Sequence, residues 1–508
     1  MMTEATTAVP PDRADRATTS AAEVDPYSGT MLRVLTAWIV FVVFLSFVTV
    51  PWLKAGNNGD LTDPMIWFYH AIMIPTAVLF LILCTRVFTL HPWARYVVTR
   101  GAIVAIFESI GLLIRGYGDL HNVASVAAFG TWIDLPCTLV MFSLTAVFLV
   151  GLVATTFIPR AGQVVSRQKI EITWALFLSG VSAMTWVLFG MIYSASEVGI
   201  NFGFWARTQK EPLSGFLGNI VTSHSHGMLP AFMAGIVLLA AEAFGYSRLD
   251  GARKQVARVG VGVMLAGIAL YSGVYFIAGL GNYAIPTWFP FGPGGVNGLA
   301  MDDTMTGLVG IGTLILAGAM LPEVRQSFSR LGSTVAKRFN PVRASVYLTY
   351  VMATGAMFFY GFYIEMNESR FGFGALPASL AIDDQIFTRS HLLFVFGALP
   401  VMAVFLVAAE IAGDTSRVGV TLRRWMSGLM VVGMVVTLVG MGVWVFSTPG
   451  HQANWAAGSA GEVLYIVGQA LMLVGAVIEL FTVRSANKEQ GAALGPVRPT
   501  VAPSGQPS

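Results

Sequence analysis

Charged side chains are scarce in this sequence. Asp, Glu, Lys and Arg make up 11% of its 508 residues, whereas hydrophobic residues make up 55%. A soluble domain of this size needs far more charge on its surface, since about a quarter of the residues in an average globular protein are charged. The composition therefore excludes an ordinary soluble protein and favours one that spans a membrane.

Cysteine is nearly absent, and several functional motifs are missing. Cys84 and Cys137 lie far apart in apolar segments, which argues against a disulfide framework and against a cysteine-ligated metal. The sequence has no Gly-Lys-Ser/Thr phosphate loop, no dinucleotide fingerprint at the start of a helix and no Cys-x-x-Cys-His haem attachment site. It also has no basic patch interleaved with aromatic residues, so no nucleic-acid partner is expected.

Apolar residues occur instead in long blocks. Twelve runs of at least about 17 mostly apolar residues are long enough to cross a hydrocarbon core as helix. They begin near Leu32, Met65, Tyr96, Leu135, Ile172, His226, Val259, Thr304, Val346, His391, Met426 and Gly461. We expect an all-α integral membrane protein of about twelve transmembrane helices over residues 32–482, with disordered tails at 1–31 and 483–508.

Lys and Arg are distributed unevenly among the predicted loops. Eighteen of the thirty fall in loops that follow even-numbered helices, and six follow odd-numbered helices, among them Arg115 after the third. Cytoplasmic loops retain positive charge. We therefore expect a multi-pass protein of the plasma membrane, surrounded by membrane lipid, with both termini in the cytoplasm.

The predicted helices repeat along the sequence. The second, sixth and tenth each have a histidine near the outer end, namely His70, His226 and His391, followed by a proline. The histidines are 156 and 165 residues apart, and long outer loops rich in Gly and Asn precede the fourth, eighth and twelfth helices. The pattern predicts three pseudo-equivalent four-helix units, approximately 32–158, 170–322 and 344–482, although chance alignment of three histidines is the competing explanation.

His70 and His391 are embedded in apolar helix with no carboxylate nearby in sequence. Two neutral imidazoles from facing helices can hold a haem iron between them, so this pair is predicted to bind a low-spin haem b. Arg389, two residues before His391, is placed to neutralise a haem propionate or a nearby carboxylate. For either histidine alone, helix packing or hydrogen bonding is an equally good interpretation.

His224 and His226 are candidate ligands of copper or iron near the sixth helix. Two residues along an ideal helix are separated by about 200° around its axis, so both face one site only if the helix start is unwound. A helix start capped by Ser223 and Ser225 is the competing interpretation. Glu108, inside the third helix, is a candidate for proton movement or for a polar contact between helices.

Twelve spans in three units, with cytoplasmic termini and histidines on the second, sixth and tenth helices, resemble the large subunit of the haem-copper oxidase superfamily. That superfamily includes cytochrome c oxidase subunit I and nitric oxide reductase. The resemblance covers residues 32–482 at the level of architecture and a few residues. It implies that His70 and His391 ligate a low-spin haem, and that His224 or His226 binds a second metal.

The sequence also departs from this family. Arg389 stands where the family has the ligand of its high-spin haem, and the seventh helix, 259–280, lacks the family's adjacent pair of histidines. No tyrosine matches the one that accompanies the family's histidine on the sixth helix. The resemblance therefore implies a degenerate relative with an incomplete binuclear centre.

Three functions are consistent with these features. The leading hypothesis is a membrane b-type cytochrome that transfers electrons at the outer face, with an outer electron donor or a companion subunit as partner. Whether it is also an oxidoreductase acting on oxygen or nitric oxide is left open. The alternative is a secondary transporter or channel-like permease without haem, although transporters usually have two repeats and polar sites near the midplane. The third is a non-catalytic scaffold.

Overall fold

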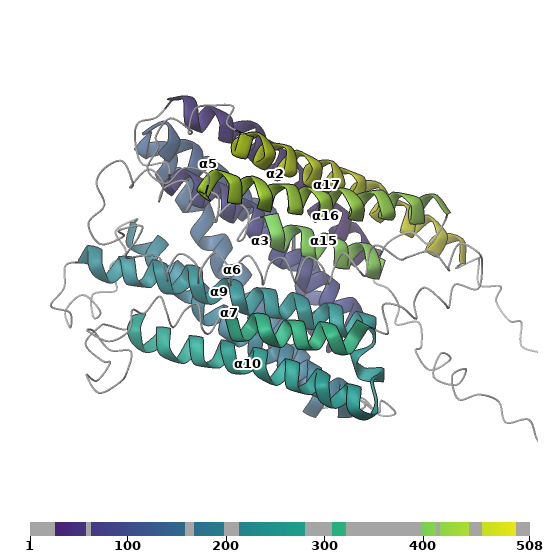
Figure 1. Ribbon diagram of the computed structural model, residues 1–508. Coiled ribbons are helices and arrows are strands. Elements are labelled where there is room, and N and C mark those ends of the chain that lie inside the picture. The colour runs from purple at the N-terminus through teal and green to yellow at the C-terminus, as the bar shows by residue number, and fades with distance from the viewer. Residues whose placement is uncertain are drawn as a thin grey trace, which may run out of the picture.

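The computed structural model describes residues 26–56, 62–157, 167–197, 213–279, 307–321, 398–412, 417–446 and 460–493. Within these ranges the chain forms helices joined by short connections, and no strand is present. Most of the helices are long and run side by side as a bundle (Figure 1). The predicted all-α fold is confirmed for this part of the chain.

Eight helical segments in the described ranges are long and apolar enough to cross a membrane. The helices, in chain order, are α2 (Pro26–Gly56), α3 (Thr62–Val87), α4 (Pro92–Gly101), α5 (Val104–Leu120), α6 (Ala124–Phe157), α7 (Arg167–Glu197), α9 (Leu213–Phe244), the 3-10 helix η2 (Tyr246–Arg248), α10 (Gly251–Gly279), a helix at Gly307–Leu321, α15 (Leu399–Ala412), α16 (Arg417–Phe446) and α17 (Ala460–Ala493). Helices lie at eleven of the twelve predicted positions. The ninth, from Val346, lies outside the described residues.

Several boundaries differ from those expected. Helix α2 begins at Pro26 and α17 continues to Ala493, so helix extends into both segments predicted as tails. Proline is favoured in the first turn of a helix, and the segment after Val483 is rich in helix-forming Ala, Lys, Glu and Gln. The long outer loop expected before the fourth helix is wrong: only residues 121–123 separate α5 from α6.

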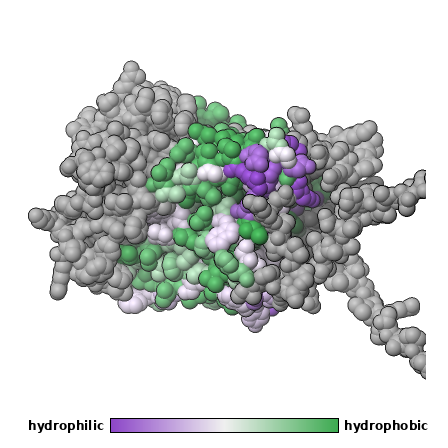
Figure 2. Space-filling model, turned by 90° about the horizontal axis from the view of Figure 1, so that it is seen from below, coloured by the Kyte–Doolittle hydropathy of each residue, from purple (hydrophilic) through white to green (hydrophobic). Residues whose placement is uncertain are grey.

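The outer surface of the bundle is apolar. Phe129, Trp132 and Phe157 are 60%, 61% and 70% exposed, and aliphatic side chains on other helices are similarly exposed. Figure 2 shows that hydrophobic residues cover most of the described surface on one face, with the largest polar group toward one end. Such a surface suits lipid, because in water it would be a large apolar patch. The described helices are those of a multi-pass membrane protein.

Three helices form the centre of the bundle. In the apolar 18-residue stretches of α3 and α9, 72% and 78% of the residues are buried inside the bundle, against 33–50% in the other candidate spans. Nearly all of α15 is buried as well, and α3, α9 and α15 pack on one another (Figure 1). These are the second, sixth and tenth predicted helices. The helices at these three predicted positions are therefore central, and the others surround them.

Helices α5 and α6 cross at two glycines. A Cβ added to Gly111 would lie within 3.0 Å of the Gly130 carbonyl oxygen and the Asp134 backbone nitrogen. A Cβ added to Gly130 would in turn meet the Gly111 carbonyl oxygen and the Arg115 backbone nitrogen. The two backbones are in contact, which is the close approach that small residues permit between membrane helices.

The same crossing occurs between α10 and the helix Gly307–Leu321. A Cβ on Gly260 would meet the carbonyl oxygen of Gly312 and the backbone nitrogen of Leu316. A Cβ on Gly312 would meet the carbonyl oxygen of Gly260 and the backbone nitrogen of Met264. In both crossings each glycine lies against its partner and against the amide four residues beyond that partner.

Helices α16 and α17 form a third crossing of this kind. Gly433 faces the carbonyl oxygen of Gly468 and the backbone nitrogen of Met472, and Gly468 faces those of Gly433 and Thr437. In sequence, a second glycine follows seven residues after the first in α5, α10 and α16. The third and fourth, seventh and eighth, and eleventh and twelfth predicted helices thus pair by one geometry.

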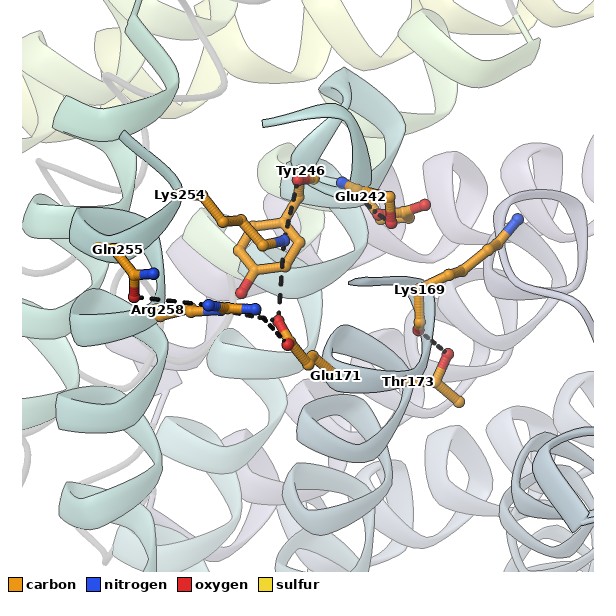
Figure 3. A network of polar contacts seen from close by, with 9 residues as sticks. Lys169, Glu171, Thr173, Glu242, Tyr246, Lys254, Gln255 and Arg258 are labelled. Atoms are coloured by element: carbon orange, nitrogen blue, oxygen red, sulfur yellow. Dashed lines mark hydrogen bonds and ion pairs between the residues drawn. The ribbon is translucent and has the colours of Figure 1, made fainter. Parts of the chain in front are cut away.

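A polar cluster joins α7, η2 and α10 at one end of the bundle (Figure 3). The carboxylate of Glu171 accepts hydrogen bonds from Arg258 at 2.5 and 3.0 Å and lies 3.9 Å from Lys254 Nζ. Lys254 also donates to the carbonyl of Tyr246 and lies 3.6 Å above its ring. Burial raises the pKa of the Tyr246 phenol to about 12 and lowers the pKa of Lys254. The cluster fixes how α10 leaves the turn after α9.

Candidate functional site

His70 lies in the first half of α3, with its ring oriented by its own helix. Nδ1 is 2.7 Å from the carbonyl oxygen of Ile66, one turn earlier. A carbonyl oxygen only accepts hydrogen bonds, so Nδ1 carries the hydrogen. The neutral ring then has its lone pair on Nε2, which is the arrangement of a histidine that binds a metal.

His224 of α9 is held in the same way by the neighbouring helix α7. Its Nδ1 lies 2.6 Å from the carbonyl oxygen of Trp186. The ring also lies directly against Gly190 of α7, where a Cβ would come within 2.6 Å of the imidazole Cε1. The absence of a side chain at Gly190 therefore makes room for the ring, and the carbonyl fixes Nε2 as the nitrogen with the lone pair.

The structure brings these two histidines together. The rings of His70 and His224 have centres 5.8 Å apart and planes inclined by 12°. Two imidazoles that bind one ion place a nitrogen about 2 Å from it, so their ring centres lie on the order of 6 Å apart with the ion between them. The observed separation is close to that value, and each ring offers one lone pair. Two neutral imidazoles are donors of the kind that bind a haem iron or another metal.

Aromatic rings surround His70. Tyr69 meets its ring edge-on at 5.1 Å, and the ring centre of Trp67 lies 6.0 Å away. Both aromatic side chains are buried. The guanidinium carbon of Arg115 lies 3.3 Å from the centre of the Trp67 ring. His70 is therefore linked, through one indole ring, to a buried charge on α5.

Arg115 belongs to a second polar group, between α5 and α6. Its Nη1 is 3.8 Å from Asp134 Oδ2, and both side chains are at most 5% exposed. Thr138 Oγ1 lies 2.7 Å from Glu108 Oε1 and 3.1 Å from Asp134 Oδ1. Glu108 is 1% exposed. The predicted interhelical role of Glu108 is thus observed, with Thr138 as its partner.

A proline and a serine dock α3 on α5 beside this group. Pro75 has no N–H, so the carbonyl of Ala71, four residues earlier, loses its partner within the helix. Ser109 Oγ of α5 donates to that carbonyl at 2.6 Å and accepts a hydrogen bond from Trp38 Nε1 at 2.9 Å. The serine therefore satisfies the carbonyl that the proline leaves free.

The remaining predicted ligands are placed only in part. His391 and Arg389 lie outside the described residues, and the backbone of His226 is in α9 whereas its side chain is not described. The interpretation of His224 as part of a capped helix start is wrong, because α9 begins at Leu213, about three turns earlier. In the described part of the chain, no group of three or more His, Cys, Asp or Glu is arranged to hold a metal ion.

Sequence reasoning missed three residues of the site. Arg115 was assigned to an outer loop, whereas it lies within α5 and is buried. Asp134 and Thr138 received no role, although Asp134 is a lone carboxylate within an apolar run. A signal for the two charged residues is their spacing from the crossing glycines. Arg115 lies four residues after Gly111, and Asp134 lies four residues after Gly130.

No family model matches the sequence, and no curated protein matches it significantly.

Proposed function

We propose that this chain is a membrane b-type cytochrome in which His70 and His224 hold a haem iron, with electrons passing to or from a partner at the predicted outer face. The supporting observation is the pair itself: two nearly parallel rings with centres 5.8 Å apart, each with Nδ1 held by a backbone carbonyl. His70 and His224 would hold the haem iron through Nε2, and the haem would supply electron transfer. His391, which the resemblance implies as the partner of His70, is the competing second ligand.

The surrounding residues support this role by fixing the ligands before any group binds. The carbonyls of Ile66 and Trp186 select the tautomer and orient both rings, which is the usual task of the groups behind a metal-binding histidine. Gly190 admits the ring of His224 between helices. Buried Trp67 and Tyr69 keep water from one side of His70.

We also propose that the chain is built from three equivalent four-helix units with twelve spans. Two features support this architecture. Three glycine crossings share one geometry, and the second, sixth and tenth predicted helices correspond to the central helices α3, α9 and α15. Chance similarity between apolar segments does not explain why a glycine crossing and a central helix recur at the same place in each unit.

The test of the haem site is a reduced-minus-oxidised visible spectrum of detergent-purified protein from haem-replete cells. We expect a sharp low-spin b-type signal that His70→Ala and His224→Ala abolish. His91→Ala is the matched control, because His91 precedes α4, away from the pair, and should leave the signal unchanged. If His391→Ala loses the signal and His224→Ala retains it, His391 is the second ligand instead of His224. A colourless wild-type protein would contradict the proposal.

Proton-coupled transport is the second candidate function. It is favoured by one observation, the buried group of Glu108, Asp134 and Arg115 within two spanning segments. Ionisable groups inside membrane spans often line pathways for ions or protons. A colourless protein that drives proton-dependent uptake into vesicles would favour this function.

A further inference from the structure

The crossing of α5 and α6 carries two charges where the other two crossings carry none. Arg115 and Asp134 each lie four residues beyond a crossing glycine. The corresponding pairs are Met264 with Leu316, and Thr437 with Met472. The fold therefore closes this kind of crossing without ionised side chains, and helix packing alone does not require the Arg115 and Asp134 pair.

Retaining these charges is costly. An Arg or Asp within a membrane helix opposes insertion of that helix into lipid. Arg115 and Asp134 are 4% and 3% exposed, and the 3.8 Å contact between them offsets part of this cost. Removing charge from water without a structural need is characteristic of groups that bind or conduct ions or protons.

The hydrogen bonds around Thr138 indicate which ligand this group holds. Its single hydroxyl faces both Glu108 Oε1, at 2.7 Å, and Asp134 Oδ1, at 3.1 Å, and it also lies 3.1 Å from the backbone carbonyl of Asp134. A hydroxyl has one hydrogen to donate, so it cannot satisfy two ionised carboxylates at once. Both contacts are favourable when one carboxyl is protonated and donates to the hydroxyl oxygen, while the hydroxyl donates to the other.

Glu108 is the carboxyl that fits the protonated form. Its second oxygen, Oε2, is buried and has no hydrogen-bond partner, and the residue is 1% exposed. A buried oxygen without a partner is far more costly on an ionised carboxylate than on a neutral acid. Asp134 instead has Arg115 beside it, which balances a negative charge.

We propose that Glu108 and Asp134, bridged by Thr138, form a membrane-embedded site for one exchangeable proton, with Arg115 balancing the remaining charge. On binding, one proton adds to a carboxylate oxygen of the pair and gives a carboxylic acid. The proton is the ligand, and no other reactant is needed. The argument for this site does not rest on the proposed haem, because none of its residues is a proposed metal ligand.

Other titratable groups lie around the site on three helices. Arg115 is on α5, and Cys137 is the neighbour of Thr138 on α6. On α3, which packs on α5, the Trp67 ring lies 3.3 Å from the Arg115 guanidinium carbon and its centre lies 6.0 Å from that of the His70 ring. A change in the charge of the carboxyl pair would therefore act on His70 through Arg115.

Infrared difference spectroscopy of the full-length protein in lipid tests the proposal. A protonated carboxylic acid gives a carbonyl stretch that shifts when the proton exchanges for deuterium. We expect such a band at neutral pH, lost in Glu108→Gln and shifted in both Asp134→Asn and Thr138→Val. Glu479→Gln is the matched control, since it removes a fully buried carboxyl on a different helix, α17, and should leave this band unchanged.

A second variant keeps the test decisive if single substitutions impair folding. Arg115→Met combined with Asp134→Leu reproduces the residues of the second crossing, Met264 and Leu316. We expect this double variant to purify at wild-type yield, whereas Arg115→Met alone leaves a buried carboxylate unpaired and gives less protein. If a folded Glu108→Gln protein retains the full band, with no change in Asp134→Asn, the pair does not hold the proton and the proposal is overturned.

Discussion

The tautomer and the orientation of His70 and His224 are set by the carbonyl that each Nδ1 contacts. His70 uses a carbonyl of its own helix and His224 uses one from α7, yet both rings end with the lone pair on Nε2. The sequence identified both residues as candidate ligands, because isolated imidazoles in apolar helix are costly and are usually functional. It also paired His70 with His391, and that pairing stays a prediction because His391 lies outside the described residues. Matching positions in a repeat do not by themselves reveal which helices face each other.

The carbonyl of Ala71 permits a sharp test at the scale of single residues. Ser109→Ala leaves this buried backbone carbonyl oxygen without a hydrogen-bond donor, and the expected loss of stability is about 1–3 kcal/mol. Pro75→Ala supplies an N–H to the same oxygen. We therefore expect Ser109→Ala to cost less in a Pro75→Ala background than in the wild type, in a double-mutant cycle measured by denaturant unfolding in detergent micelles.

Equal costs in both backgrounds would contradict this account. That result would mean that Ser109 acts mainly through its hydrogen bond from Trp38, which Pro75→Ala does not alter.

At the scale of helices, pairing is controlled by glycines whose position matters more than their number. Gly428 and Gly433 both lie in α16, but a Cβ on Gly428 would meet nothing within 4 Å, whereas one on Gly433 would meet the backbone of α17. Gly433→Ala should therefore force α16 and α17 apart and destabilise the protein by about 1–3 kcal/mol, as overpacking of a close contact does.

Gly428→Ala is the matched control on the same helix. It should be neutral, or should stabilise the helix by up to about 1 kcal/mol, because alanine loses less conformational entropy than glycine. Thermal unfolding of both variants, followed by loss of monomer on size-exclusion chromatography, separates the two expectations. Equal unfolding midpoints would show that the crossing does not depend on backbone contact.

For the whole molecule, hydropathy was sufficient to predict the helical class and the position of most described helices, because a bilayer demands long apolar runs. It failed for Arg115, since a charge near the end of an apolar run looks the same whether it enters a loop or continues a helix. It also failed at the α5 and α6 connection, where the helical stretch around Gly118 and the first turns of α6 were read as a loop because of their glycine, aspartate and asparagine. Both errors arise because the partner that satisfies a polar group is a tertiary feature.

The predicted topology also applies to the molecule as a whole. The excess of Lys and Arg in even-numbered loops predicts that both termini lie in the cytoplasm. Alkaline phosphatase fused after residue 122 should be active in the periplasm of a bacterial host, and green fluorescent protein fused to either terminus should fluoresce. A dark fusion at one terminus, with expression of the intact chain confirmed by immunoblot, would mean an odd number of spans.

The Arg115 and Asp134 contact also has a consequence for how the chain enters the membrane. The two charges lie on helices joined by only three residues, 121–123, and they face each other across a crossing at which the backbones touch. Separately, each charge would oppose the transfer of its helix from the translocon into lipid. Released together as a closed hairpin, they form an electrically neutral dipole. We therefore expect α5 and α6 to enter the membrane together as a hairpin, with α5 held at the translocon until α6 has been synthesised.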